Sequence, residues 1–451
     1  MDTRDVALTV LLDIETNQTF SNIALGNALR KNQFTDKVER AFLSRLVEGV
    51  TETKLRLDYV IDQYSKTKIK KCKPVIACLL RMGCYQILFM DSVPDSAACN
   101  ECVKLAKKHG FAGLSGFVNG VLRTITREKT KLAYPDQKRE PERYLSVMTS
   151  TPLWLVQKLI LEYGTESAET IFQAAFADRK TSIRLNKHRI EENGETMDSY
   201  KNRLKEAGIT VEPGAYYEGA WLLSGYDFIH KIPGYKQGYF TVQDESSMCA
   251  VAAAGIQPED FVMDICAAAG IQPEDFVMDI CAAPGGKTTA AAEFAQQGHV
   301  LSMDIAEEKL ELIEENVERL KLANVDIRCQ DATEYMQEQE EKADVVIADL
   351  PCSGLGIMGR KNDIKYRVTE EQIESLVELQ HTILQNACRY VKAGGTLLYS
   401  TCTITKEENT LQVERFLKEH REYTLKEQRQ FLQGIDACDG FYYAVLHKLG
   451  D

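Results

Sequence analysis

Two cysteines in this chain each stand just beyond an apolar segment, next to residues that turn the backbone. Cys352 lies in Asp349–Gly354 (DLPCSG), and Cys402 lies in Tyr399–Thr403 (YSTCT). Packing in a core is the commoner role of a free cysteine. A pair at one sheet edge instead favours nucleophilic chemistry, because a thiol with a pKa of about 8.5 becomes reactive where a helix terminus or a basic side chain lowers that pKa.

A glycine turn after the apolar segment Phe276–Cys281 is a second candidate site. Gly285 and Gly286 permit positive φ and close approach of a ligand, and the helix expected to begin at Lys287 directs its first N–H groups into the same space. The glycine spacing excludes a Walker A loop and the G-x-G-x-x-G motif, which makes a NAD oxidoreductase a weak alternative. Taken alone, the turn is as compatible with a structural role as with a binding role.

Three carboxylates follow successive predicted strands of the same region. Asp304 stands 23 residues after Cys281, where an acidic side chain can accept both ribose hydroxyls of a nucleoside. Asp331 follows the next strand and is placed to contact an adenine edge, and Asp349 ends the strand after that. Each alone is more often a surface or capping residue. Together with the glycine turn, they predict a nucleoside cofactor.

A doubly wound parallel sheet is expected to position these residues, because short apolar segments alternate with helical stretches such as Glu307–Lys321 and Glu370–Val391. Ligands of such sheets bind at the carboxyl ends of the strands, where the carboxylates above would lie. The predicted strands are Phe276–Cys281, His299–Asp304, Val325–Cys329, Ala343–Asp349 and Gly395–Ser400.

Three domains are predicted along the chain. Residues 1–135 show apolar side chains at helical spacing and form an all-α domain; residues 131–143, charged and with two prolines, have little to bury and serve as a linker. Residues 144–237 form a small α/β module, and residues 238–451 hold the larger sheet. The expected elements of the module are the helices Pro152–Tyr163 and Met197–Ala207 and the strands Thr181–Leu185 and Ala220–Leu223.

Composition and charge narrow the class of partner. The 451 residues are 44% hydrophobic and 27% charged, as in globular proteins, and no run approaches the ~20 apolar residues that span a bilayer. The start does not resemble a signal peptide, so the 13 cysteines are expected to be reduced thiols in the cytoplasm. Residues 1–150 hold 24 Lys and Arg against 17 Asp and Glu, in a chain of net charge −13. This basic block is densest at 65–73. It is as compatible with a polyanionic partner as with a merely solvated surface.

One segment is repeated without change: residues 252–266 (AAAGIQPEDFVMDIC) recur as 267–281. Two copies do not make a solenoid, which needs at least three repeats. Only the second copy runs into the glycine turn, so only it can supply the strand that precedes the turn. We expect the extra copy to be extruded as a loop or to replace its twin upstream.

These residues together resemble the RNA (cytosine-5)-methyltransferases. The family's D-x-C-A-A-P-G-G-K loop matches Asp279–Lys287, its D-x-P-C-S-G motif matches Asp349–Gly354, and its S-T-C-T motif matches Ser400–Thr403. Arg360–Tyr366 is similar to a further family segment but lacks its proline, and Asp439–Tyr442 resembles the family's closing D-G-F-F strand. The first domain resembles the NusB-type RNA-binding domain of one subgroup, and the second resembles that subgroup's connecting module.

The resemblance implies a Rossmann-like, S-adenosylmethionine-dependent domain at 238–451 that methylates C5 of a cytosine in ribosomal RNA. It implies that Cys402 attacks C6 of the base, that Cys352 releases the adduct, and that Asp349 holds the polar edge of the base. The implied cofactor residues are Cys281, Ala282, Ala283, Pro284, Gly285, Gly286, Lys287, Asp304, Asp331 and Asp349. The RNA contacts are assigned to Lys66, Lys68, Lys70, Lys71, Lys73, Arg123 and Arg184.

Two alternatives remain open at this point. The same chemistry could act on transfer RNA, or the chain could be a non-catalytic RNA-binding or antitermination factor in which the sheet is a scaffold. The intact glycine loop, carboxylates and cysteines argue against the scaffold. A cytoplasmic monomer without a membrane partner is expected. No metal is predicted, because the C-x-x-C pair of Cys99 and Cys102 stands alone in a helical region.

Overall fold

The computed structural model describes residues 2–31, 36–253 and 271–450. By their internal contacts they form two compact units, Met1–Phe176 with Met358–Arg367, and Ala177–Ile357 with Val368–Asp451. The division into domains at 1–135, 144–237 and 238–451 stays a prediction. Among the described residues, none of the helices has the length and apolarity to cross a membrane. The same residues contain no group of His, Cys, Asp or Glu side chains suited to a metal ion.

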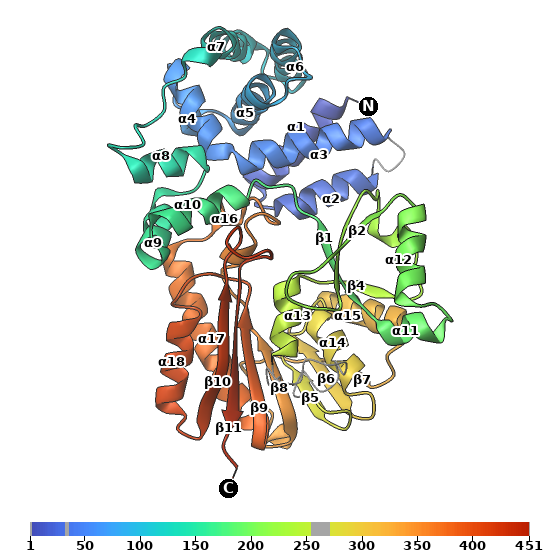
Figure 1. Ribbon diagram of the computed structural model, residues 1–451. Coiled ribbons are helices and arrows are strands. Elements are labelled where there is room, and N and C mark those ends of the chain that lie inside the picture. The colour runs from blue at the N-terminus through green and yellow to red at the C-terminus, as the bar shows by residue number, and fades with distance from the viewer. Residues whose placement is uncertain (1, 32–35, 254–270, 451) are drawn as a thin grey trace. The chain divides into compact units, whose positions relative to one another are not determined.

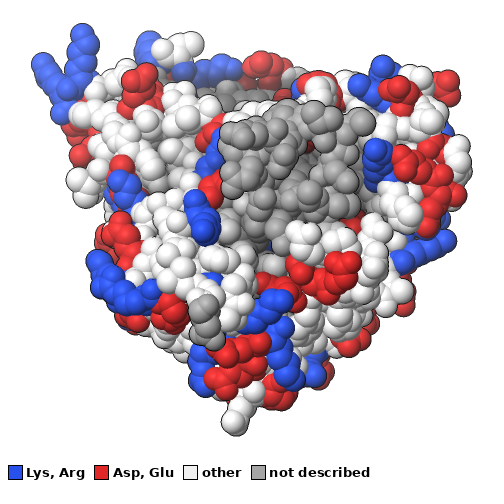
Figure 2. Space-filling view, turned by 60° about the horizontal axis from the view of Figure 1, so that its bottom comes forward, with Lys and Arg blue, Asp and Glu red and all other residues white. Residues whose placement is uncertain are grey.

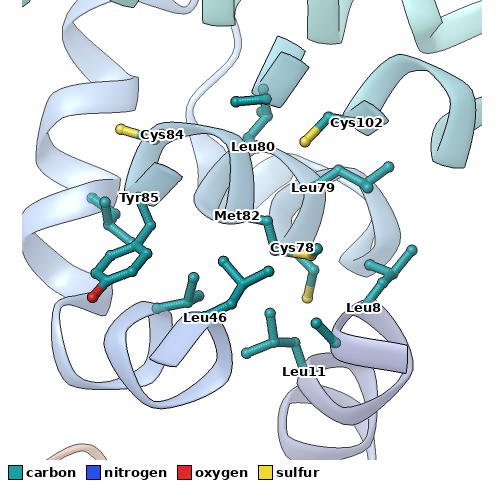
Figure 3. Packing of buried hydrophobic residues seen from close by; sticks show 14 of the residues in the cluster. Leu8, Leu11, Leu46, Cys78, Leu79, Leu80, Met82, Cys84, Tyr85 and Cys102 are labelled. Atoms are coloured by element: carbon teal, nitrogen blue, oxygen red, sulfur yellow. The ribbon is translucent and has the colours of Figure 1, made fainter. Parts of the chain in front are cut away.

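The first unit is built from helices, as the sequence predicts (Figure 1). They are α1 (Thr3–Thr16), α2 (Ser21–Lys31), α3 (Lys37–Glu52), α4 (Lys54–Tyr64), α5 (Pro74–Phe89), α6 (Asp95–Lys108), α7 (Ser115–Glu128), α8 (Pro141–Met148), α9 (Leu153–Tyr163), α10 (Thr165–Ala174) and α16 (Ile364–Arg367). Helix α5 is central, because it packs against α1, α3, α4, α6 and α7. Its Leu79, Leu80 and Met82 lie in one cluster with Leu8 and Leu46 (Figure 3).

The predicted linker at 131–143 contains the start of a helix and two side chains that pack against the helical core. Helix α8 begins inside it, at Pro141. Leu132 and Tyr134 pack against the core of the helical unit, and the Tyr134 ring stacks on Tyr59 with 6.2 Å between ring centroids. The prediction that this segment has little to bury was wrong, because two apolar side chains among its charges anchor it to the helices.

The first unit also includes a short segment from far along the chain, Met358–Arg367. The Asp363 carboxylate accepts hydrogen bonds from the Ser21 amide (3.2 Å) and hydroxyl (2.7 Å). The Tyr366 hydroxyl donates to the carbonyl of Glu52 (2.9 Å). Nothing in the local sequence predicts this placement, because the partners lie more than 300 residues away.

A four-stranded antiparallel sheet of order β2-β3-β1-β4 begins the second unit. Its strands are β1 (Thr181–Leu185), β2 (Thr210–Pro213), β3 (Ala220–Ser224) and β4 (Phe240–Val242), accompanied by helices α11 (Lys187–Glu192) and α12 (Met197–Glu206). The fully buried Tyr200 of α12 stacks on Trp221 of β3 and so fixes the helix against the sheet. The predicted strands and the predicted helix at Met197–Ala207 are confirmed. The helix predicted at Pro152–Tyr163 also forms, as α9, but it belongs to the first unit.

A seven-stranded sheet of order β10-β11-β9-β8-β5-β6-β7 forms the rest of the second unit. Its strands are β5 (Phe276–Asp279), β6 (His299–Asp304), β7 (Val325–Cys329), β8 (Ala343–Asp349), β9 (Val391–Thr401), β10 (Tyr423–Phe431) and β11 (Phe441–Lys448). Strand β11 runs antiparallel to β9 and β10, and the pairs from β9 to β7 are parallel. This confirms the doubly wound architecture, although β10 was not predicted.

Helices cover both faces of this sheet (Figure 1). Helices α17 (Glu370–Tyr390) and α18 (Thr410–Glu419) pack on one face, and α13 (Glu245–Ala252) and α14 (Gly286–Phe294), with α15 (Glu307–Leu320) beside α14, on the other. Each face of the sheet carries an apolar cluster, and the two clusters are formed by alternate residues of the strands. Met278 and Val346 belong to the cluster under α17 and α18, and Val277 and Ile347 belong to the cluster under α13 and α14. Because both faces are buried, ligands reach the sheet at its strand ends.

The second copy of the repeated segment supplies the first parallel strand, as predicted. Strand β5 lies within 267–281 and leads directly into the glycine turn. Ala252, the first residue of the other copy, ends helix α13. The expected extrusion of the extra copy concerns residues 254–270, which lie outside the described residues.

Candidate active site

The glycine turn connects β5 to α14 and is anchored to the neighbouring strand. The Ala282 amide donates to the carbonyl of Met303 on β6 (2.8 Å). Gly285 has a φ of +95°, a left-handed conformation that side chains rarely adopt. A Cβ there would also lie 3.3 Å from Ile313 of α15. The turn therefore needs glycine for both conformation and packing, and it leaves the N-terminus of α14 facing the strand ends.

Asp304 and Asp331 lie at adjacent strand ends, as predicted. Asp304 is buried, accepts a hydrogen bond from the Ala283 amide (3.2 Å), and lies 3.3 Å from the Lys309 ammonium. Asp331 follows β7 and accepts from the amide of Thr333 (2.8 Å). Since each carboxylate oxygen can accept a second hydrogen bond, Asp304 keeps capacity for a ligand while the turn holds it in place.

Asp279, at the end of β5, carries a buried oxygen without a partner. Its side chain is fully buried, and Oδ2 accepts from the Thr288 hydroxyl (2.7 Å), whereas Oδ1 has no hydrogen-bond partner in the described structure. Burial raises the pKa of this carboxyl to about 7, although the bond from Thr288 opposes the shift. An unsatisfied buried acceptor costs free energy, so this oxygen indicates a place for a donor or a cation.

Lys287 and Asp349 form an ion pair above these strand ends. The Lys287 ammonium lies 2.6 Å from Oδ2 of Asp349 and is buried. The Ser400 hydroxyl donates to Oδ1 of the same carboxylate (2.8 Å), and the Phe441 ring centroid is 4.9 Å from the ammonium. The glycine turn and the two cysteine motifs are therefore joined through one pair of charges.

A cavity of about 210 Å³ opens at this edge. The glycine turn, Asp279, Lys287 and Asp349 line it, together with Gln243 and Asp244, which lead from β4 to α13. Pockets that enclose a whole drug-sized ligand measure roughly 300–1,000 Å³, so this cavity has room for one end of a cofactor. It combines an unsatisfied carboxylate oxygen with an ion pair.

The two cysteines meet, as the sequence predicts. Their sulfur atoms are 3.3 Å apart and both residues are half-buried free thiols. The hydrogen bond to Cys402 and burial raise the pKa of Cys352 well above its usual range. Cys352 is therefore the thiol that keeps its proton, which leaves Cys402 as the better placed of the two to act as a thiolate.

Cys281 has a different role from the other two cysteines. Its side chain packs against the apolar cluster under α17, and burial raises the pKa of its thiol. It therefore contributes to the glycine turn through its backbone and its packing.

The predicted RNA contacts divide into two groups. Lys66, Lys68, Lys70, Lys71, Lys73 and Arg123 are exposed on the helical unit. Arg184 is buried, where it forms an ion pair with Glu293 and donates to Gln243 (2.8 Å) and Thr289 (3.0 Å). The structure thus gives Arg184 a packing role between β1 and α14 in place of a surface contact. On the face shown in Figure 2, basic and acidic side chains are interspersed.

Two polar residues that sequence analysis missed form hydrogen bonds to the residues next to the cysteines. Glu408 and Asn409 immediately precede α18, and both are fully buried. Their position in the sequence suggests ordinary helix capping. The available signal was the pair of polar residues six and seven positions after Cys402, in a segment otherwise expected to be a loop.

The order of the seven strands, the reversed β11, the glycine turn after β5 and the acidic strand ends define a Rossmann-like methyltransferase that uses S-adenosylmethionine. Residues 270–447 match the family model described as 16S rRNA methyltransferase RsmB/F. Residues 1–127 match the NusB family, and 151–226 match the ferredoxin-like domain of RsmF/B-like methyltransferases. The chain belongs to the RsmB/F family of 16S rRNA methyltransferases.

Similar proteins cover nearly the whole chain. The probable ribosomal RNA small subunit methyltransferase B of Bacillus subtilis is 36% identical, over 99% of this chain and 99% of its own. The ribosomal RNA small subunit methyltransferase B of Vibrio cholerae is 33% identical, over 94% and 93%. The crystal structure of PH0851 has the same fold, with a TM-score of 0.81 and 22% identity over 99% of both chains.

The residues at the strand ends fit S-adenosylmethionine. The unpartnered Oδ1 of Asp279 suits the cationic ammonium at the amino-acid end of that cofactor. Asp304, at the end of the next strand, can accept from ribose hydroxyls. Ala282, Ala283, Pro284 and Gly286 of the turn line the cavity, so the backbone of the turn lies next to the space for the cofactor.

Proposed function

We propose that this enzyme methylates C5 of a cytosine in small-subunit ribosomal RNA through a covalent bond between Cys402 and C6 of the base. The observation that carries the proposal is the pair of sulfur atoms 3.3 Å apart beside the Lys287–Asp349 ion pair. S-adenosylmethionine supplies an electrophilic methyl group when bound. The residues of the chain have to make C5 nucleophilic and then restore the base.

Cys402 begins the reaction as the nucleophile. Its thiolate forms a bond to C6, and the electrons of the C5–C6 double bond move toward C5, which can then take the methyl group. Cys352 assists this step because its sulfur lies 3.3 Å from the attacking sulfur and its raised pKa keeps it protonated beside the Cys402 thiolate. A lone buried thiol would have no such partner.

The Lys287–Asp349 pair stabilises the base while Cys402 is attached. Addition at C6 makes N3 more basic, and the pair holds a proton between Nζ of Lys287 and Oδ2 of Asp349 that can be shared with N3. The Ser400 hydroxyl fixes the carboxylate from its other side (2.8 Å). The Asp349 side chain thus contacts the base, and because Asp349 ends β8 it also lines the cavity assigned to the cofactor.

Cys352 completes the reaction by receiving the proton from C5. The main cause of its raised pKa is the hydrogen bond to the Cys402 sulfur, and that cause weakens once Cys402 is a thioether. Cys352 can then lose its proton to solvent and act as a base. The C5–H electrons re-form the C5–C6 double bond, the C6–S bond breaks, and Cys402 leaves as a thiolate.

The cofactor is assigned to the strand ends. The turn 281–287 lies against its amino-acid end, with Asp279 as acceptor for the ammonium; Asp304 holds the ribose, and Asp331 the adenine edge. We assign RNA affinity to the exposed lysines at 66–73 and to Arg123, which suit phosphate contacts. The target cytosine must be unpaired or flipped to reach the cysteines. The proposed setting is the cytoplasm, where the thiols stay reduced.

The test measures methyl transfer from labelled S-adenosylmethionine to small-subunit ribosomal RNA and to transfer RNA. We expect label in a cytosine of the ribosomal RNA and none with Cys402→Ala, whereas calorimetry shows S-adenosylmethionine binding by both proteins. Label in transfer RNA alone would overturn the substrate. Methylation by Cys402→Ala would overturn the mechanism.

A further inference from the structure

The Glu408 carboxylate joins the two cysteine motifs. Oε1 accepts from the Ser353 amide (2.8 Å) and Oε2 from the Ser353 hydroxyl (2.5 Å), next to Cys352 in the chain. Oε2 also accepts from the hydroxyls of Thr403 (3.3 Å) and Thr405 (2.6 Å), just after Cys402. One buried side chain therefore holds the residues that follow both catalytic thiols.

Further donors complete the surroundings of this carboxylate. The Gln380 amide donates to Oε1 of Glu408 (3.2 Å) and to the carbonyl of Pro351 (2.9 Å). The hydroxyls of Ser353 and Thr403 lie 2.7 Å apart and so bridge the two motifs a second time. The partners of both oxygens are donors, which is the environment of an acceptor-only carboxylate.

Asn409 acts on the Cys402 motif alone. Its Oδ1 accepts from the Thr401 hydroxyl (2.6 Å), and its Nδ2 donates to the carbonyl of Thr403 (3.1 Å). These two residues flank Cys402 on either side. Nδ2 also donates to Oε1 of Gln430 on β10 (2.7 Å), so the clamp is tied to the sheet.

The Asn409 side chain does not cap helix α18. Asn409 is its N-cap residue, yet the structure shows no capping bond from the Asn409 side chain. Asparagine at this position ordinarily accepts from the first turn of its helix, a bond whose loss costs about 1 kcal/mol. Here the amide points back to the residues on both sides of Cys402. The use of a capping residue for another purpose indicates that this other contact matters to the protein.

We propose that Glu408 and Asn409 are positioning residues that hold the Cys402 and Cys352 sulfurs in register for adduct formation and adduct release. The proposal rests on the proposed function of the two thiols. Glu408 sets the distance between the motifs, because it holds both. Asn409 fixes the Cys402 motif, and Ser353 connects Glu408 to the Cys352 motif, so the two chemical steps can be disturbed separately.

The experiment follows adduct formation in the Cys352→Ala background, where adduct release is blocked. Glu408→Gln and Asn409→Ala are expected to slow the appearance of the covalent enzyme–RNA species by about tenfold or more, since each removes bonds that place Cys402. Ser353→Ala, made with both cysteines intact, is expected to let the adduct accumulate. Glu414→Gln, on the exposed part of α18, is the matched control and keeps the parent rate.

Two measurements separate positioning from a general loss of structure. Calorimetry should give S-adenosylmethionine affinities within about twofold of the parent, because the turn 281–287 does not contact Glu408 or Asn409. Alkylation of Cys402 by iodoacetamide across pH should show a displaced profile in Glu408→Gln and an unchanged one in Glu414→Gln. A structural defect would lower cofactor affinity as well.

Adduct formation in Glu408→Gln and Asn409→Ala at the rate of Glu414→Gln would overturn the proposal. The proposal would also be overturned if Asn409→Ala and Ser353→Ala each slowed adduct formation and adduct release to the same extent. If Glu408→Gln does not fold, those two variants decide the question. A parent protein that forms no adduct contradicts the proposed function, and that outcome is distinct from any difference between the variants.

Discussion

The cysteines of the helical unit and those at the sheet edge differ in what surrounds them. Cys78, Cys84 and Cys102 lie in the cluster of leucine side chains that also contains Met82 and Tyr85 (Figure 3), and burial raises the pKa of each thiol. Cys352 and Cys402 lie 3.3 Å from each other and stay half-buried. Proximity of a second thiol and partial access to solvent distinguish a reactive cysteine from a packing one.

The same contrast holds for two carboxylates, one half-buried and one fully buried. In the helical unit, both oxygens of Asp58 accept from the Arg81 guanidinium, at 2.7 and 2.9 Å. At the sheet edge, Asp279 keeps one oxygen unpartnered beside a cavity. The Asp58 oxygens are occupied by Arg81, whereas Oδ1 of Asp279, without a partner among the described residues, belongs to a side chain that lines a cavity and can accept from a ligand.

The largest expected difference is in thiol reactivity. Iodoacetamide should modify Cys402 at least about a hundredfold faster than Cys84 or Cys102, because only thiolates react and the latter thiols are buried among apolar side chains. Peptide mass spectrometry of the native protein after timed labelling measures the ratio. Comparable labelling of Cys84 would show that the contrast between the two regions is not real.

Breaking the Asp58–Arg81 pair should cost stability and leave the cofactor site intact. Asp58→Asn removes the charge that faces the buried Arg81, while Glu15 stays as a second partner 3.3 Å from its guanidinium, so the expected loss is about 1–3 kcal/mol in the free energy of unfolding. Urea denaturation measures that loss, and calorimetry should show unchanged S-adenosylmethionine affinity for the folded protein. A weakened cofactor affinity would contradict the separation.

Asp279 should make cofactor binding depend on pH. With its pKa raised to about 7, the carboxyl is protonated below that pH and ionised above it. Only the ionised form attracts an ammonium group, so S-adenosylmethionine affinity should rise several-fold between pH 6 and 8. Calorimetry in matched buffers tests this. Asp279→Asn should bind more weakly and lose the dependence; a parent-like pH profile in that variant would exclude Asp279 as the acceptor.

The smallest effect is expected from removal of residues 252–266. Because the repeat is perfect, the deletion places Ala267 and Ala268 where α13 now ends with Ala252 and Ala253. Strand β5 and the glycine turn are untouched. Calorimetric S-adenosylmethionine affinity should therefore stay within about twofold of the full chain. Loss of binding on deletion would mean that the first copy contributes to the site.

The sequence predicts the parts of this molecule that depend on local pattern. Strands β6, β7 and β8 match their expected bounds residue for residue, because alternating and apolar runs are sufficient to define them. The two cysteine motifs meet because parallel strands share one edge. The motif residues therefore predicted more of the site than composition or charge did.

What could not be predicted depends on contacts between distant segments. The bonds of Asp363 to Ser21 span 342 residues, and those of Glu408 to Ser353 span 55. Arg184 was predicted to contact RNA, but it is buried and forms an ion pair with Glu293 of α14, which lies 109 residues further along the chain. Pattern gives the elements, but the partners of a polar side chain are fixed only when the sheet and its helices assemble.

The central claim, that Cys402 attacks the base and Cys352 releases it, is tested most directly by mass spectrometry of Cys352→Ala incubated with small-subunit ribosomal RNA and S-adenosylmethionine. The predicted result is a covalent protein–RNA species attached through Cys402, which disappears in Cys352→Ala/Cys402→Ala. An adduct that persists in the double variant, or one attached through another cysteine, would contradict the account.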